Sequence, residues 1–119
     1  MTNNESFVKE LLRKVPELEN TYEQHMANND SLLPHVLMGD VTRFVLAGAE
    51  HTQKQKSIAR LLEYLEIALQ SGSDEVKELI VVSFVENLIG EDRVVAVIKP
   101  FLGKHLSEAI INTCNTSPA

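Results

Sequence analysis

The sequence is short of the residues that mark several protein classes. Its 119 residues include one cysteine, Cys114, so no internal disulfide can form, as is typical of proteins in a reducing cytoplasm. Five glycines and four prolines are too few for a collagen-like or low-complexity chain. Basic residues number eleven against seventeen acidic ones, whereas nucleic-acid-binding domains normally carry a basic patch. The sequence therefore predicts a cytoplasmic protein that binds no nucleic acid.

Long hydrophobic runs are also absent. The longest near-apolar stretch, residues 79–85, is interrupted by Ser83, whereas a membrane-spanning helix needs about 20 apolar residues. The first residues lack the basic and apolar segments of a secretory signal. Hydrophobic residues still make up 44% of the chain, which is enough to form a core. We expect one soluble domain over residues 1–119 that binds no membrane and frays from about residue 112.

Residues in the patterns that support catalysis or metal binding are equally scarce. The four histidines, His25, His35, His51 and His105, never lie three or four positions apart, so the sequence indicates no zinc site. Cys114 has no basic neighbour within five residues that would activate its thiol. Phosphate-binding glycine loops and serine nucleophile elbows are missing. These patterns predict a protein that is not an enzyme and that uses no metal, cofactor or small-molecule substrate.

Hydrophobic residues recur every three to four positions, the spacing of one helical face. This periodicity predicts helices near residues 6–15, 16–27, 33–49, 57–70, 74–89, 92–99 and 104–113. The fold class is therefore all-α, a compact single-domain bundle of six or seven helices. The fifth helix is apolar nearly all round, so we expect it at the centre. A short turn joins it to the fourth, which predicts an antiparallel pair resembling a HEAT repeat.

Smaller features refine this prediction and leave one alternative open. Ser6 is the expected N-cap of the first helix, residues 51–56 are expected to form a polar connection, and Gly39 is expected to allow a close helix crossing. The β-branched stretches 79–85 and 94–98 are also typical of strands, and they would pair as a hairpin through Gly90. A capping segment before residue 75 and Gly90 after residue 89 favour the helix.

The charge of −6 is concentrated in one part of the chain. Between Arg60 and Asp92 eight acids face only two bases, and the rest of the sequence sums to zero. The acids are Glu63, Glu66, Asp74, Glu75, Glu78, Glu86, Glu91 and Asp92. We expect them to face solvent on the fourth and fifth helices. They form either a solvated face that keeps the protein soluble or a docking surface for a basic partner.

A second polar group lies on the third predicted helix. Asp40 and Arg43 are three residues apart, so their side chains face each other, and His35 precedes them on the same helix. The pair either forms a local ion pair that fixes helix packing or orients a polar contact. It is the alternative contact region if the acids only confer solubility.

Three stretches resemble a family of short, all-helical bacterial proteins. They are LLPHVLMGDVTRF at residues 32–44, LIVVSFVENL at 79–88 and IKPFLGKHL at 98–106. Some similar small acidic proteins are immunity proteins of contact-dependent growth inhibition and related polymorphic toxin systems. The resemblance implies an all-helical fold and an immunity role without catalytic residues. The expected partner is a cognate toxin domain, a nuclease with a basic groove; the alternative is a helical adaptor with an unrelated protein partner.

Overall fold

The computed structural model describes residues 3–116, and these contain helices and no strand. In chain order the elements are α1 (Asn4–Lys14), η1 (Pro16–Leu18), α2 (Glu19–Asn29), α3 (Pro34–Gly48), α4 (Thr52–Ser71), α5 (Asp74–Ile80), η2 (Val81–Val85), α6 (Glu86–Leu88), α7 (Asp92–Ile98), η3 (Lys99–Phe101) and α8 (Lys104–Thr116). The elements α5, η2 and α6 are continuous, and we call them the central helix. The all-α prediction is confirmed, and the hairpin alternative is wrong.

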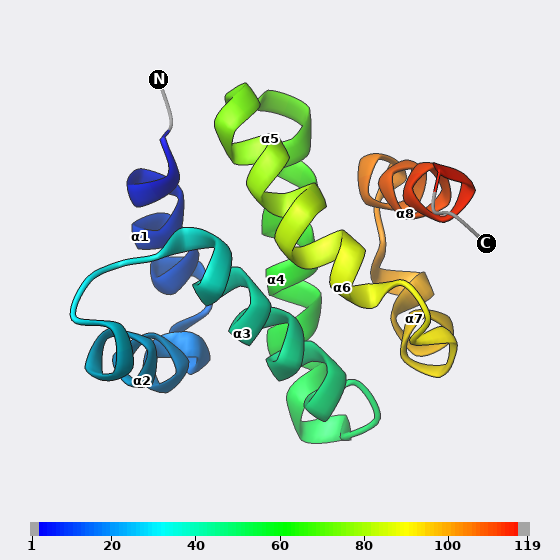
Figure 1. Cartoon of the computed structure of the whole chain (residues 1–119). Coiled ribbons are helices and arrows are strands. Elements are labelled where there is room, and N and C mark those ends of the chain that lie inside the picture. Colours follow the sequence, from blue (N-terminus) through cyan, green and yellow to red (C-terminus); the bar gives the residue numbers. More distant parts are fainter. Residues whose placement is uncertain (1–2, 117–119) are drawn as a thin grey trace.

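The central helix packs mainly against α3, α4 and α8, and its ends also contact α1 and α7. Figure 1 shows it passing in front of α4, with α3 on one side and α8 on the other. Its inner side chains are fully buried: Val76, Leu79, Ile80, Phe84, Val85 and Leu88. Contacts on several sides explain why its sequence is apolar nearly all round. Its predicted central position and its antiparallel pairing with α4 are confirmed.

The middle of the central helix, η2, is a wide π turn. The backbone N–H of Glu86 donates to the carbonyl of Val81, five residues earlier. The carbonyl of Ser83 accepts hydrogen bonds from Thr42 Oγ1 at 3.2 Å and from Asn87 Nδ2 at 2.7 Å. The Thr42 bond ties the turn to α3. Single π turns are uncommon and occur frequently at functional sites, so the π turn marks this part of the helix as a candidate site.

Several predicted boundaries differ from the structure. The N-cap of α1 is Asn3, whose Oδ1 accepts a hydrogen bond from the N–H of Ser6 at 2.8 Å, so Ser6 is not the cap. The predicted polar connection at 51–56 is mostly the start of α4, because Gln and Lys favour helix. Residues 112–116 continue α8, and the remainder of the predicted frayed tail, 117–119, lies outside the described residues.

The glycine that permits a close approach is not the expected one. A Cβ added at Gly39 would meet only Asn87 Nδ2, at an ordinary 3.9 Å, so the prediction for Gly39 is wrong. A Cβ added at Gly103 would lie 2.6 Å from Oε1 of Glu66. Gly103 therefore lets the start of α8 approach a carboxylate of α4.

Candidate functional site

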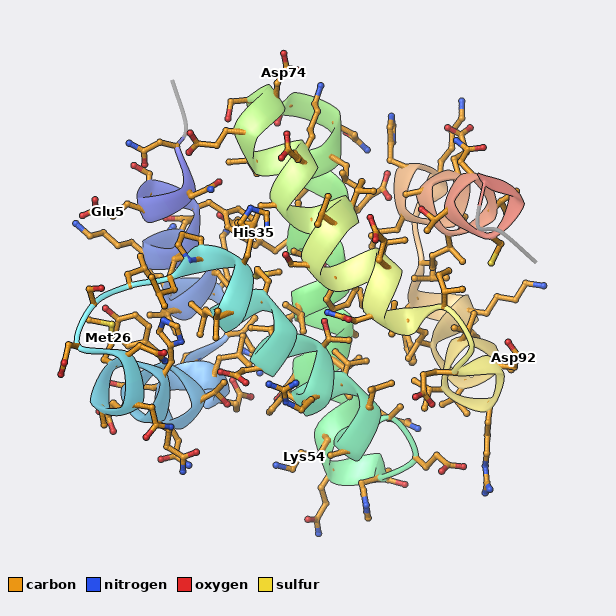
Figure 2. The ribbon with its side chains drawn as sticks, in the orientation of Figure 1. Glu5, Met26, His35, Lys54, Asp74 and Asp92 are labelled. Atoms are coloured by element: carbon orange, nitrogen blue, oxygen red, sulfur yellow. The ribbon has the colours of Figure 1, made fainter. Side chains whose placement is uncertain are left out.

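Five of the eight predicted acids lie along the central helix and the start of α7. We call these exposed residues, Asp74, Glu78, Glu86, Glu91 and Asp92, the acidic ridge. Figure 2 places Asp74 and Asp92 at opposite ends of the central helix. Within residues 3–116 no side chain forms an ion pair with any of the five. The ridge therefore presents unneutralised carboxylates to solvent.

An exposed valine interrupts the acidic ridge. Val82, in the π turn, is 43% exposed although most apolar residues of this helix are fully buried. It lies four residues from both Glu78 and Glu86, so the three side chains are neighbours on one side of the helix. Val82 therefore places an apolar contact between two free carboxylates.

Polar and apolar groups of α3 lie next to this valine. Nδ1 of His35 lies 2.5 Å from Oγ of Ser83, which follows Val82 in the π turn. Figure 2 shows His35 beside the central helix. Val36, the next residue of α3, is 46% exposed. The π turn therefore contacts α3 at His35, a residue of the region that the sequence indicated as an alternative contact.

Glu66 does not belong to this surface, because it is buried and binds the N-terminus of α8. Its Oε1 accepts a hydrogen bond from the N–H of Leu106 at 2.8 Å, and its Oε2 accepts one from the N–H of His105 at 3.0 Å. Oε2 also lies 2.7 Å from Nδ1 of His105 and 3.2 Å from Nε2 of Gln70. The expectation that Glu66 faces solvent is wrong. Its carboxylate points inward because the first backbone N–H groups of α8 need hydrogen-bond acceptors.

The protonation of Glu66 follows from these contacts. Burial alone raises the pKa of the carboxyl group, because water no longer solvates its charge. The backbone N–H groups of Leu106 and His105, together with the side chains of His105 and Gln70, outweigh burial and lower the pKa to about 2. Glu66 is therefore ionised at neutral pH and serves as a remote cap of α8. The absence of a capping side chain at Gly103 was the one sequence signal of this role.

Two further acids of the predicted surface, Glu75 and Glu63, also lie outside the acidic ridge. Oε2 of Glu75 accepts a hydrogen bond from the N–H of Asn4 at 2.7 Å, so this exposed carboxylate binds the N-terminus of α1. Glu63 is exposed, but it lines a separate cavity of about 230 Å³ with Lys14 and Arg60 on the side of α4 that faces α1. The eight acids therefore do not form one surface.

The Asp40–Arg43 pair forms as the sequence predicted. Arg43 donates from Nη2 to Oδ1 of Asp40 at 2.5 Å. The other carboxylate oxygen, Oδ2, lies 4.0 Å from Nδ1 of His25, whose side chain is fully buried on α2. The local ion pair is confirmed, and the structure adds a histidine that sequence spacing did not connect with it. His25 and Asp40 are fifteen residues apart and on different helices, so periodicity gave no signal of this contact.

An apolar cavity of about 410 Å³ lies elsewhere, between α1 and α2. Its lining is mainly apolar and includes Leu12, Tyr22 and Met26, with Glu5 and Lys9 at its edge. None of the predicted site residues lines it. No group of three or more His, Cys, Asp or Glu side chains in the described part of the chain is arranged to hold a metal ion. No helix in that part is both long and apolar enough to cross a bilayer.

These features define a class, a small all-α domain with an unpaired acidic ridge on its central helix. The chain belongs to the family described as "Domain of unknown function (DUF7674)", whose model matches residues 8–116. The match begins well before residues 32–106, the part that carries the resemblance in the sequence. No curated protein and no solved structure matches the chain.

Proposed function

We propose that the protein is an immunity protein that binds a basic toxin domain through the acidic ridge. The observation that carries the proposal is the exposed Val82 between the free carboxylates of Glu78 and Glu86. Protein interfaces commonly combine an apolar centre with a polar rim. An acidic rim favours a partner with a basic surface, because complementary potentials attract the two proteins before contact.

The partner proposed is a nuclease toxin. A nuclease binds phosphates through a basic groove, and a row of carboxylates competes for that groove with the nucleic acid. Asp74, Glu78 and Glu86 of the ridge lie on a helix whose opposite side is fully buried, so the backbone that carries them is already fixed before binding. A fixed backbone lowers the entropy lost on binding. Neutralisation then requires occlusion of the groove and no chemical step.

A helical adaptor with an unrelated partner is the second candidate. The apolar cavity between α1 and α2 favours it, because such a cavity receives an aliphatic or aromatic anchor from another protein. No residue of the acidic ridge lines this cavity. Substitutions in the two regions therefore separate the two functions.

The deciding experiment expresses the C-terminal domain of the protein encoded directly upstream, which the proposal expects to be the toxin, and measures whether this chain protects the cells. One variant reverses three ridge charges, Glu78→Lys, Glu86→Lys and Asp92→Lys. The matched control reverses three exposed acids outside the ridge, Glu19→Lys, Glu23→Lys and Glu108→Lys, with the same change in net charge. We expect the control to protect cells and the ridge variant to fail while it remains folded by circular dichroism.

Two results would contradict the proposal. Equal protection by both variants would show that the ridge only confers solubility. Failure of the parent protein to protect against, or bind, the upstream gene product would reject the immunity function. Loss of another protein's binding on substitution of Met26 in the α1–α2 cavity would then favour the adaptor.

A further inference from the structure

The connection between α2 and α3 is attached to a buried histidine. Figure 1 shows this connection as a long arc at the edge of the molecule. Of the backbone N–H groups in residues 31–33, only that of Leu33 has a hydrogen-bond partner within the described residues, and this partner is Nε2 of His25 at 3.0 Å. Leu33 directly precedes α3. One side chain of α2 therefore holds the end of the connection in place.

This hydrogen bond requires an uncharged imidazole ring. A backbone N–H is always a donor, so Nε2 of His25 accepts through its lone pair and the ring hydrogen is on Nδ1. Protonation would place an N–H group at Nε2 as well, facing the N–H of Leu33. Two donors cannot form a hydrogen bond with each other. The charged ring and the attached connection therefore exclude one another.

The surroundings of the ring do not stabilise a charge in place. The side chain of His25 is fully buried, so a charge there would be removed from water. Asp40 is the only acid among the described residues with an oxygen within 4.0 Å of the ring, and its Oδ2 lies 4.0 Å from Nδ1. Its other oxygen binds Arg43, whose positive charge weakens the attraction between the carboxylate and a charged ring. A protonated ring therefore gains by moving towards water and away from Leu33.

Release of Leu33 would also affect the apolar cavity between α1 and α2. The residues on either side of Leu33, Leu32 and Pro34, both line this cavity. At the other end of the connection, Asp30 has a φ of 62°, a left-handed conformation that costs free energy for a residue with a Cβ. A released connection can relax this backbone and withdraw two of the apolar side chains that line the cavity.

We propose that His25 is a proton-sensitive switch that controls the connection between α2 and α3 and, through it, the opening of the apolar cavity. Nε2 takes up one proton from solvent, the hydrogen bond from Leu33 breaks, and no other bond changes. The open form binds one proton more than the closed form. The closed form is therefore favoured at neutral and higher pH and loses stability as the pH falls. The inference depends on neither the acidic ridge nor the toxin.

The test follows the intact protein by NMR from about pH 7.5 to about pH 4.5. Long-range ¹H–¹⁵N spectra report which ring nitrogen carries hydrogen, and hydrogen exchange reports the protection of each amide. We expect His25 to carry its hydrogen on Nδ1 at the upper end of this range. Below about pH 6.5, where an exposed imidazole takes up a proton, protection of the Leu33 amide should fall by up to about tenfold per pH unit.

Two further signals distinguish local opening from unfolding. The methyl resonances of Leu32 and Met26, which both line the cavity, should shift over the same pH range as the Leu33 amide. The amide of Phe84, whose side chain is fully buried in the core, should keep its protection.

Matched variants assign the effect to His25. His25→Gln removes the titrating group, so protection of Leu33 should no longer depend on pH in this range. Asp40→Asn removes the carboxylate nearest the ring and should move the release of Leu33 to lower pH, which provides a test if His25→Gln does not fold. His51→Gln, at an exposed histidine before α4, is the control and should behave like the parent.

Three results would overturn the proposal. In the first, His25 takes up a proton while the shift and protection of the Leu33 amide stay constant, so the charged ring does not release the connection. In the second, Leu33 loses protection only together with Phe84, so acid unfolds the whole protein. In the third, the parent and His25→Gln show the same pH dependence, which would assign the release to another group.

Discussion

Glu66 and Glu78 show how the same side chain serves two purposes on paired helices. Glu66, on α4, is buried under the start of α8 and accepts hydrogen bonds from two backbone N–H groups. Glu78, on α5, is exposed and forms no ion pair with any described residue. The inner carboxylate stabilises the fold, whereas the outer one remains available to a partner. Substitutions on the buried side and on the exposed side of the α4–α5 pair should therefore have different effects, and the predictions below compare them.

The largest expected effect compares two residues of the central helix. Phe84→Ala should lower the free energy of unfolding by about 3–5 kcal/mol, because Phe84 is fully buried and the change leaves a cavity. Val82→Ala, on the exposed side, should change it by less than about 0.5 kcal/mol. Urea denaturation measures both values. Equal losses would show that the central helix is not anchored by its inner side.

The next effect compares the two carboxylates directly. Glu66→Gln should destabilise the protein by about 1–3 kcal/mol, because one amide oxygen replaces two acceptors and backbone N–H groups of α8 lose a partner. Glu78→Gln should have almost no effect on stability. Hydrogen exchange of the His105 and Leu106 amides should accelerate only in the Glu66 variant. Unchanged exchange there would contradict the capping role.

The pH dependence sharpens the same comparison. The pKa of Glu66 is lowered in the folded state to about 2, and the unfolded value for Glu is about 4.3. Its contribution to stability is therefore fully present above the unfolded pKa and is lost as the pH falls from about 5 to 2. The stability difference between the parent and Glu66→Gln should shrink over this range. A difference that stays constant from pH 7 to pH 2 would contradict an ionised cap.

A smaller effect is expected at the glycine before α8. A Cβ at Gly103 would lie 2.6 Å from Oε1 of Glu66, so Gly103→Ala requires the carboxylate or the helix to move. The loss of stability should be about 1 kcal/mol or more. Gly39→Ala, where the added Cβ has room, should be neutral or stabilising. A reversed order of the two melting temperatures would contradict the packing described for α8.

The smallest effect is expected at the lone cysteine. Cys114 is exposed on α8, and no metal-binding group of side chains is present among residues 3–116. Cys114→Ser and treatment with a chelator should both leave the melting temperature unchanged. A clear decrease in either experiment would reveal a thiol or metal contribution to the fold.

Local patterns predicted the helices, because the spacing of apolar residues reports directly on which face is buried. The central position of Phe84 and the Asp40–Arg43 pair followed from the same local reasoning. The buried role of Glu66 did not, since it depends on His105 and Leu106, about forty residues away. Gly103 gave the only hint, because α8 begins without a local capping side chain.

The acidic ridge was predicted only in part for the same reason. Net charge identified the segment, but it does not distinguish a carboxylate that binds a helix terminus, such as Glu75, from one that remains free, such as Glu86. The π turn also escaped prediction, because its β-branched sequence is equally typical of a strand. The hydrogen bond from the backbone N–H of Leu33 to Nε2 of His25 is another contact that the sequence does not reveal.

The most direct test of the central claim is the rate of association with the proposed partner, the C-terminal domain of the protein encoded directly upstream, as a function of ionic strength. Stopped-flow fluorescence would compare the parent, the ridge variant and the control variant. If the ridge attracts the partner, the parent and the control should associate quickly at low salt and slow as salt rises, while the ridge variant should associate slowly at all salt concentrations. Identical rates and salt dependence for the ridge variant and the control would contradict the claim.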